Sequence, residues 1–110
     1  MSIRVPLKRV RKEFLLAYEL EGCRKAVALL AEYYGTRKMK IILDGRRVGK
    51  GNVACYFKNK AYFAPRGLNR RTVLHEWYHH IVSAKGLEMS GRTEEKEANL
   101  YARDFLRNHD

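Results

Sequence analysis

The chain has 110 residues, 45% of them apolar, and a formal net charge of +11. This length allows one domain with one modest core, and the composition excludes both a disordered chain and a disulfide-rich miniprotein. We therefore predict a single domain over residues 1–110. Its charge is uneven, because residues 1–74 hold 18 Lys and Arg against 5 Asp and Glu, whereas residues 75–110 hold 5 against 7. Such a basic excess suits a solvated surface or phosphate binding.

Apolar residues recur at helical spacing over residues 7–34. This spacing predicts helix, ended by Gly35. Gly22 interrupts the stretch and disfavours a continuous helix by about 1 kcal/mol relative to Ala, so two helical pieces are a natural alternative to one.

Three short runs of β-branched or aromatic residues follow, at residues 39–43, 53–57 and 61–64. Glycines and a Lys58-Asn59-Lys60 turn separate them. The pattern predicts three strands, of which the last two form a hairpin.

Two more helices are predicted after Pro65. Asn69 is a suitable cap for a helix that runs to about residue 84, and Thr93 for a final helix. The apolar residues of that last helix repeat at i, i+3, i+4 and i+7, at Ala98, Tyr101, Ala102 and Phe105. The predicted fold class is α+β, in the order helix, three strands, helix, helix.

The remaining composition points to an intracellular chain. Cys23 and Cys55 lack CxxC spacing, so reduced cysteines in the core are expected, although one disulfide between them is compatible with the sequence. No apolar run has the length of a secretory signal core or of a membrane span. We therefore expect a cytoplasmic protein with no membrane association.

The helix over residues 70–84 carries the sequence His75-Glu76-Trp77-Tyr78-His79, an HExxH motif. Residues four apart project from one helix face, so the two imidazoles can converge on one tetrahedral zinc ion. Glu76 is displaced from them by one residue, which suits a general base acting on water beside the metal. His80 points about 100° away from His79 and is not expected to join the site.

A catalytic zinc usually has three protein ligands, so a third is expected. The acidic cluster Glu94-Glu95-Lys96-Glu97 lies on the last predicted helix. Glu94 and Glu95 flank its inward face, whereas Glu97 lies about 100° away and is disfavoured. Asn99 follows Glu95 by one helical turn and could orient a ligating histidine, which favours Glu95.

These two motifs together resemble the gluzincin metallopeptidases, whose third zinc ligand is a glutamate on a following helix. The size and element order are most similar to the archaeal minigluzincins, and the glutamate helix is similar to that of the ImmA/IrrE regulatory proteases. The resemblance implies a zincin-like fold, zinc bound by His75, His79 and Glu95, Glu76 as the general base and Asn99 behind a ligand.

The resemblance also implies hydrolysis of a peptide or protein substrate. We expect that substrate to lie extended along an edge strand at residues 53–57. Some families of this kind include latent forms. A second hypothesis is therefore a latent or non-catalytic zinc domain, in which His109 or the terminal carboxylate fills the open zinc position of its own chain or of a neighbouring copy.

A third hypothesis is a nucleic-acid-binding module with a structural metal. Tyr56, Tyr62 and Phe63 could offer stacking faces, although core positions are the more common role of such residues. The basic residues in the predicted turns are Arg46, Arg47, Lys50, Lys58, Lys60, Arg66, Arg70 and Arg71.

Overall fold

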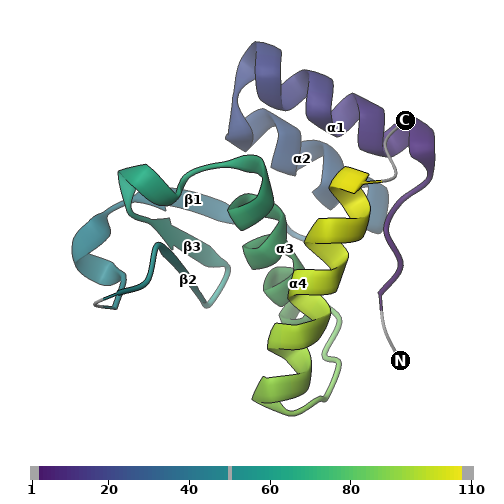
Figure 1. The fold of residues 1–110 in the computed structure, drawn as a ribbon. Coiled ribbons are helices and arrows are strands. Elements are labelled where there is room, and N and C mark those ends of the chain that lie inside the picture. The colour runs from purple at the N-terminus through teal and green to yellow at the C-terminus, as the bar shows by residue number, and fades with distance from the viewer. Residues whose placement is uncertain (1–2, 50, 108–110) are drawn as a thin grey trace.

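A computed structural model describes residues 3–49 and 51–107 of the chain. Over these residues the fold is α+β, with four helices and a three-stranded mixed sheet (Figure 1). The predicted fold class is confirmed, and the predicted order of elements holds except that the first predicted helix consists of two helices. In chain order the elements are α1 (Lys8–Glu21), α2 (Cys23–Tyr34), β1 (Lys40–Leu43), β2 (Ala54–Phe57), β3 (Lys60–Phe63), α3 (Arg70–Ala84) and α4 (Gly91–Arg107).

The first helical stretch consists of two helices, which meet at Gly22. This glycine has a φ of 99°, a conformation that L side chains rarely adopt, and its N–H still bonds to the carbonyls of Ala17 and Tyr18. The chain reverses there, so that α1 and α2 pack against each other (Figure 1). Of the two alternatives that the sequence allowed, the two-piece interpretation is therefore correct.

The sheet has the strand order β1-β3-β2, which leaves β1 and β2 at its edges. Strands β2 and β3 form the predicted antiparallel hairpin, whose turn residues Lys58 and Asn59 have φ values of 47° and 69°. Two consecutive positive φ values are typical of a type I′ turn, the twist of which matches the flanking strands. Strand β1 pairs with β3 in parallel.

Helix α3 is fixed by its first turn and by the loop before it. The side chain of Asn69 accepts a hydrogen bond from the Thr72 N–H, and Thr72 Oγ1 accepts one from the Asn69 N–H. This reciprocal capping box confirms the predicted start of α3. In the preceding loop, a Cβ at Gly67 would lie 2.4 Å from the Cβ of Val53. Only glycine therefore allows the loop before α3 to approach the residue before β2 this closely.

Helix α4 begins earlier than the sequence suggests. Ser90 Oγ accepts a hydrogen bond from the Thr93 N–H at 3.2 Å, and Glu94 N–H bonds to the Ser90 carbonyl. The prediction that Thr93 caps this helix is wrong, because Ser90 is equally suited to capping and stands three residues before it. The predicted inward face is confirmed, since its four apolar residues are buried against α3 and the core.

The two cysteines are both free, as expected. Cys23 is buried at the start of α2, whereas Cys55 is only half-buried on the edge strand β2, so its predicted core position is wrong. Within the described ranges, none of the helices combines the length and apolar composition needed to cross a bilayer.

The edge strand β2 is tied to α3 through a buried histidine. His80 Nε2 lies 2.7 Å from the Arg37 carbonyl oxygen and must donate to it, so His80 Nδ1 accepts from the Tyr56 hydroxyl at 2.9 Å. Tyr56→Phe would leave that nitrogen without its donor. We expect a loss of about 1–3 kcal/mol in the free energy of unfolding, measured by urea denaturation. Tyr33→Phe, at an exposed ring, is the matched control and should change little.

Candidate metal centre

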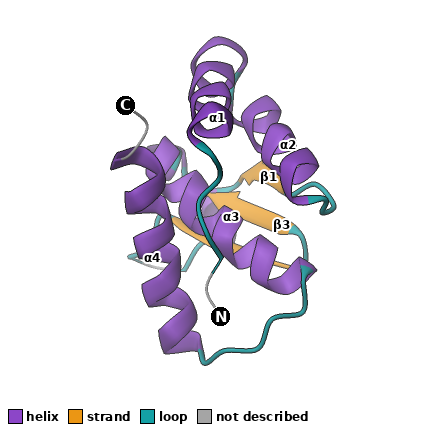
Figure 2. Cartoon of the chain, turned by 90° about the vertical axis from the view of Figure 1, so that its right-hand side faces the viewer, coloured by secondary structure: helices purple, strands orange, loops and turns teal. Residues whose placement is uncertain are grey.

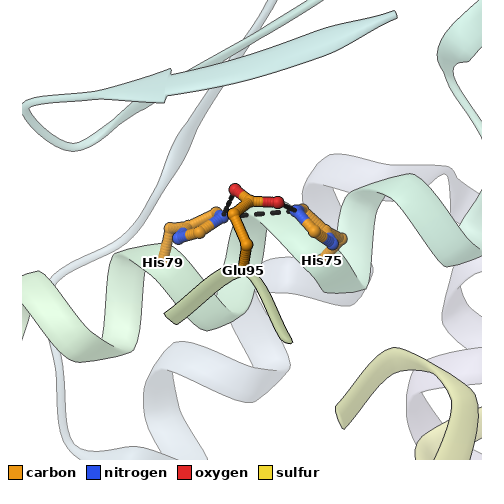
Figure 3. A group of neighbouring side chains, drawn as sticks. All are labelled: His75, His79 and Glu95. Carbon is orange, nitrogen blue, oxygen red and sulfur yellow. Dashed lines mark hydrogen bonds and ion pairs between the residues drawn. The ribbon is translucent and has the colours of Figure 1, made fainter. Parts of the chain in front are cut away.

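The central feature of the site is a group of three side chains contributed by two helices. His75 and His79 project from the same face of α3, and Glu95 reaches them from α4 (Figure 3). Glu95 Oε2 lies 3.1 Å from His75 Nε2, and Glu95 Oε1 lies 2.9 Å from His79 Nε2. The two Nε2 atoms are 3.2 Å apart. The structure thus brings together the three ligands expected from the sequence.

The spacing of these donor atoms fits a tetrahedral zinc site. Zinc binds imidazole nitrogen at about 2.0–2.1 Å, so two ligand atoms of a regular tetrahedron are separated by about 3.3 Å. The observed separations of 2.9–3.2 Å are close to that value, with each histidine nitrogen nearest to a different oxygen of the Glu95 carboxylate. Two nitrogens and one carboxylate oxygen are also a donor set that zinc commonly uses in catalytic sites.

The hydrogen bond behind His79 leaves the other ring nitrogen for a metal. His79 Nδ1 lies 2.5 Å from Glu94 Oε2 and donates a hydrogen bond to it, so Nε2 is the nitrogen that can bind a metal ion. Glu95 Oε1 and His75 Nε2 lie within 3.2 Å of that nitrogen. A metal ion placed there would be within reach of all three side chains.

His75 is held in a form suited to ligation. Burial lowers the pKa of His75, which keeps the imidazole neutral near pH 7. The side chain of Asn99 lies within hydrogen-bonding reach of His75. Asn99 therefore adjoins His75, and its orienting role remains a prediction from the sequence.

Glu94 is the functional residue that the sequence argument missed as an orienting group. It was considered there only as an alternative third ligand. In the structure its carboxylate bonds to Nδ1 of His79, whereas the carboxylate of Glu95 lies beside Nε2 of the same ring. One sequence signal could have indicated this role of Glu94. Glu94 and Glu95 flank the same helix face, and a histidine that binds a metal needs a hydrogen-bond acceptor on its other nitrogen as well as a neighbouring ligand.

Glu76 is buried beside the ligand group, with only 6% of its surface exposed. Burial raises the pKa of Glu76 to about 7, the charge of His79 opposes this rise, and that of Glu95 adds to it. A carboxyl group with a pKa near neutrality can both accept and return a proton under ordinary conditions. Its position and its pKa therefore suit a general acid and base.

A cleft of about 600 Å³ gives access to the ligand group. One side is formed by β2 and the two residues before it, and the other by α3 from Arg71 to His79 and by the first half of α4. Glu76 and the two histidines lie along it, together with Arg71 one helical turn before His75. The edge strand is thus adjacent to the ligands, as the sequence argument expected.

The other candidates lie away from the ligand group. His80 bonds to Tyr56 and Arg37 on a different side of α3, in agreement with its exclusion. Glu97 is half-buried in a shallow depression with Val5 and Leu100, so it is not a ligand, but neither does it point freely into solvent. His109, the proposed blocking residue, lies outside the described residues.

Comparison of the chain with protein-family models, with curated proteins and with solved structures finds no match. The functional argument therefore depends on the geometry of the site.

The hydrogen bond from His79 to Glu94 leads to a testable expectation. Glu94→Gln keeps the shape of the side chain but removes the charge that polarises His79. Loss of such a partner lowers metal affinity by about 10–100-fold, and we expect a change of this size in a competition titration with a zinc chelator. Glu88→Gln, at an exposed position between α3 and α4, should leave the affinity unchanged. Equal affinities for the parent and Glu94→Gln would contradict this role.

Proposed function

We propose that this chain is a zinc-dependent metallopeptidase of the gluzincin type. The observation that carries the proposal is the convergence of His75, His79 and Glu95 at zinc-like spacing, with the buried carboxyl group of Glu76 beside them. The resemblance of the two motifs to gluzincins supports the same conclusion. His75, His79 and Glu95 would hold the metal.

Zinc, when bound, supplies a Lewis acid that activates water and polarises a carbonyl group. Glu76 accepts a proton as the oxygen of water adds to the peptide carbonyl carbon. The carbon–nitrogen bond then breaks, and Glu76 returns the proton to the leaving amine. This balance requires water and the peptide alone, and the raised pKa of Glu76 suits both transfers.

The substrate would be an extended peptide segment. The free edge of β2 lines the cleft and has no second strand partner among the described residues. Its backbone N–H and C=O groups can pair with an added strand, which would place one peptide bond beside Glu76 and the ligand group. Both Arg71 and the ligands lie on the opposite side of the cleft from this edge.

The proposal is tested with the purified full-length chain and with a chain that ends at Leu106. Each is stripped of metal, reloaded with one equivalent of zinc and incubated with a mixture of unstructured peptides, and the products are identified by mass spectrometry. We expect cleavage that depends on zinc and stops with a chelator. Cleavage by the shorter chain alone would indicate latency caused by the tail. No cleavage by either zinc-loaded chain would contradict a peptidase function.

A further inference from the structure

The sheet presents a second functional surface on the side that faces away from the core. Ile41, Ala61 and Phe63 point inward and are buried, so the alternate residues of each strand point outward. We call this side the outer sheet face. It consists of Lys40, Ile42, Cys55, Phe57, Lys60 and Tyr62.

Two like charges stand directly opposite each other on this face. Lys40 of β1 pairs with Lys60 of β3 in the sheet register, and both side chains are exposed. Like charges on paired residues destabilise a sheet, and none of the six outer-face residues is acidic. Asp44, which follows β1, is already paired with Arg46. The two lysines therefore have no acidic partner among the residues of the sheet, although Lys40 also lines a hollow that includes Glu21 and Glu32 of the helices.

Aromatic rings accompany these cations. Phe57 pairs with Lys60 across the hairpin and is 61% exposed, an unusual position for a phenylalanine. The Lys58 ammonium lies 5.2 Å from the centre of the Phe57 ring, and the Arg47 guanidinium lies 5.8 Å from that of Tyr62. Each ring is thus combined with a cation.

We propose that the outer sheet face binds single-stranded nucleic acid. Cations arranged around exposed aromatic rings match a ligand in which phosphates alternate with flat bases, because each base can stack on a ring while its phosphate meets a lysine or arginine. The carboxylates of an acidic peptide would satisfy the charge of Lys40 and Lys60 but would not stack on Phe57, whereas every nucleotide has both a charge and a flat base. The rings therefore favour nucleic acid.

Of the six outer-face residues, Cys55 also lines the cleft at the metal centre, whereas the other five do not. Ala54 and Tyr56 pair with the inward-facing Phe63 and Ala61, so they belong to the inner side of β2, which meets α3, whereas Phe57 belongs to the outer side. Some of the basic turn residues singled out in the sequence do contribute here, namely Arg47, Lys58 and Lys60. Phe63 does not, since it is buried, and Lys50 lies outside the described residues.

The test measures binding of a fluorescent oligothymidylate of about 12 nucleotides to the zinc-loaded full-length chain, by anisotropy, over a range of salt concentrations. We expect the affinity to fall steeply with salt. Lys40→Ser combined with Lys60→Ser should reduce the slope of log affinity against log salt by about 1.4, since each phosphate contact on a single strand contributes about 0.7. Phe57→Ser should weaken binding at least about fivefold through lost stacking.

Matched controls carry the same changes on α1. Lys8→Ser combined with Lys12→Ser removes two exposed charges, and Leu20→Ser removes an apolar side chain that is 72% exposed. The α1 lysine pair should leave the slope of log affinity against log salt unchanged, and Leu20→Ser should leave the affinity unchanged. Three results would overturn the proposal: no binding at about 50 mM salt, equal effects of the two lysine pairs, or displacement by polyglutamate together with unchanged binding by Phe57→Ser. None of these results depends on peptidase activity.

Discussion

Glu76→Gln is expected to abolish peptide hydrolysis while the chain still binds one equivalent of zinc. Glu76 is absent from the group of side chains whose donor atoms converge, so its loss should not remove a ligand. The amide cannot accept the proton of the attacking water or return one to the leaving amine. General acid–base catalysis contributes about 10²–10⁴-fold to such reactions, and the turnover number should fall by at least that factor.

The measurement combines two readings on the same sample. Zinc content is determined by elemental analysis, and turnover is followed with the best peptide from the cleavage screen. Glu97→Gln is the control, because Glu97 is a half-buried glutamate that lies away from the ligand group, beside Val5 and Leu100. It should retain both zinc and turnover. If Glu76→Gln cleaves peptides at the parent rate, Glu76 is not the general base.

Stability separates a chemical role of Glu76 from a structural one. The parent carries a carboxyl group that is 6% exposed, and burial of a charged form is costly. Glutamine has nearly the same volume and no charge. The variant should therefore unfold at the same temperature as the parent or above it, and a marked drop would indicate that lost activity reflects lost structure.

Local sequence signals predicted the elements that carry the site. The HExxH spacing, the Asn69 cap and the periodic face of α4 each depend on residues within a few positions of one another, and each has a direct geometric meaning. The same reasoning located the α1–α2 break at Gly22. It failed at the start of α4, where Ser90 and Thr93 are both good caps and only the structure shows which one accepts the hydrogen bond.

These local signals could not predict which distant segments of the chain lie side by side. The sequence predicted a β2–β3 hairpin, but nothing in it specified that β1 pairs with β3 in parallel, because that pairing joins segments far apart in the chain. The consequence for function is large, since this pairing brings Lys40 beside Lys60 and leaves β2 as the edge that lines the cleft. The distinct roles of Glu94 and Glu95 likewise emerge only once α3 and α4 lie side by side (Figure 2).

The second prediction with a large effect is that bound zinc links α3 to α4. Glu95, the proposed ligand from α4, belongs to a different helix from both histidines, which belong to α3. Zinc should therefore stabilise the folded chain by joining the helices, and at a free zinc concentration about 1,000 times the dissociation constant the gain is about 4 kcal/mol. For a domain of this size, that corresponds to a rise in melting temperature of roughly 15 °C.

Glu95→Gln is expected to remove most of this zinc-dependent rise, as measured by calorimetry with and without metal. The amide of glutamine is a poor zinc ligand, so only the two histidines would hold the metal. Because both belong to α3, the bound zinc would no longer join α3 to α4. Without metal, the variant should unfold close to the parent, because Glu95 is exposed and its side chain is not part of the core.

The three neighbouring glutamates provide an internal comparison for this last result. Glu94→Gln should keep a reduced rise, since it weakens the orientation of His79 and leaves the three ligands in place, and Glu97→Gln should keep the full rise. If Glu94→Gln removes the rise and Glu95→Gln keeps it, the assignments of ligand and orienting residue are reversed. An equal loss in all three variants would instead indicate that zinc responds to the general negative charge of α4.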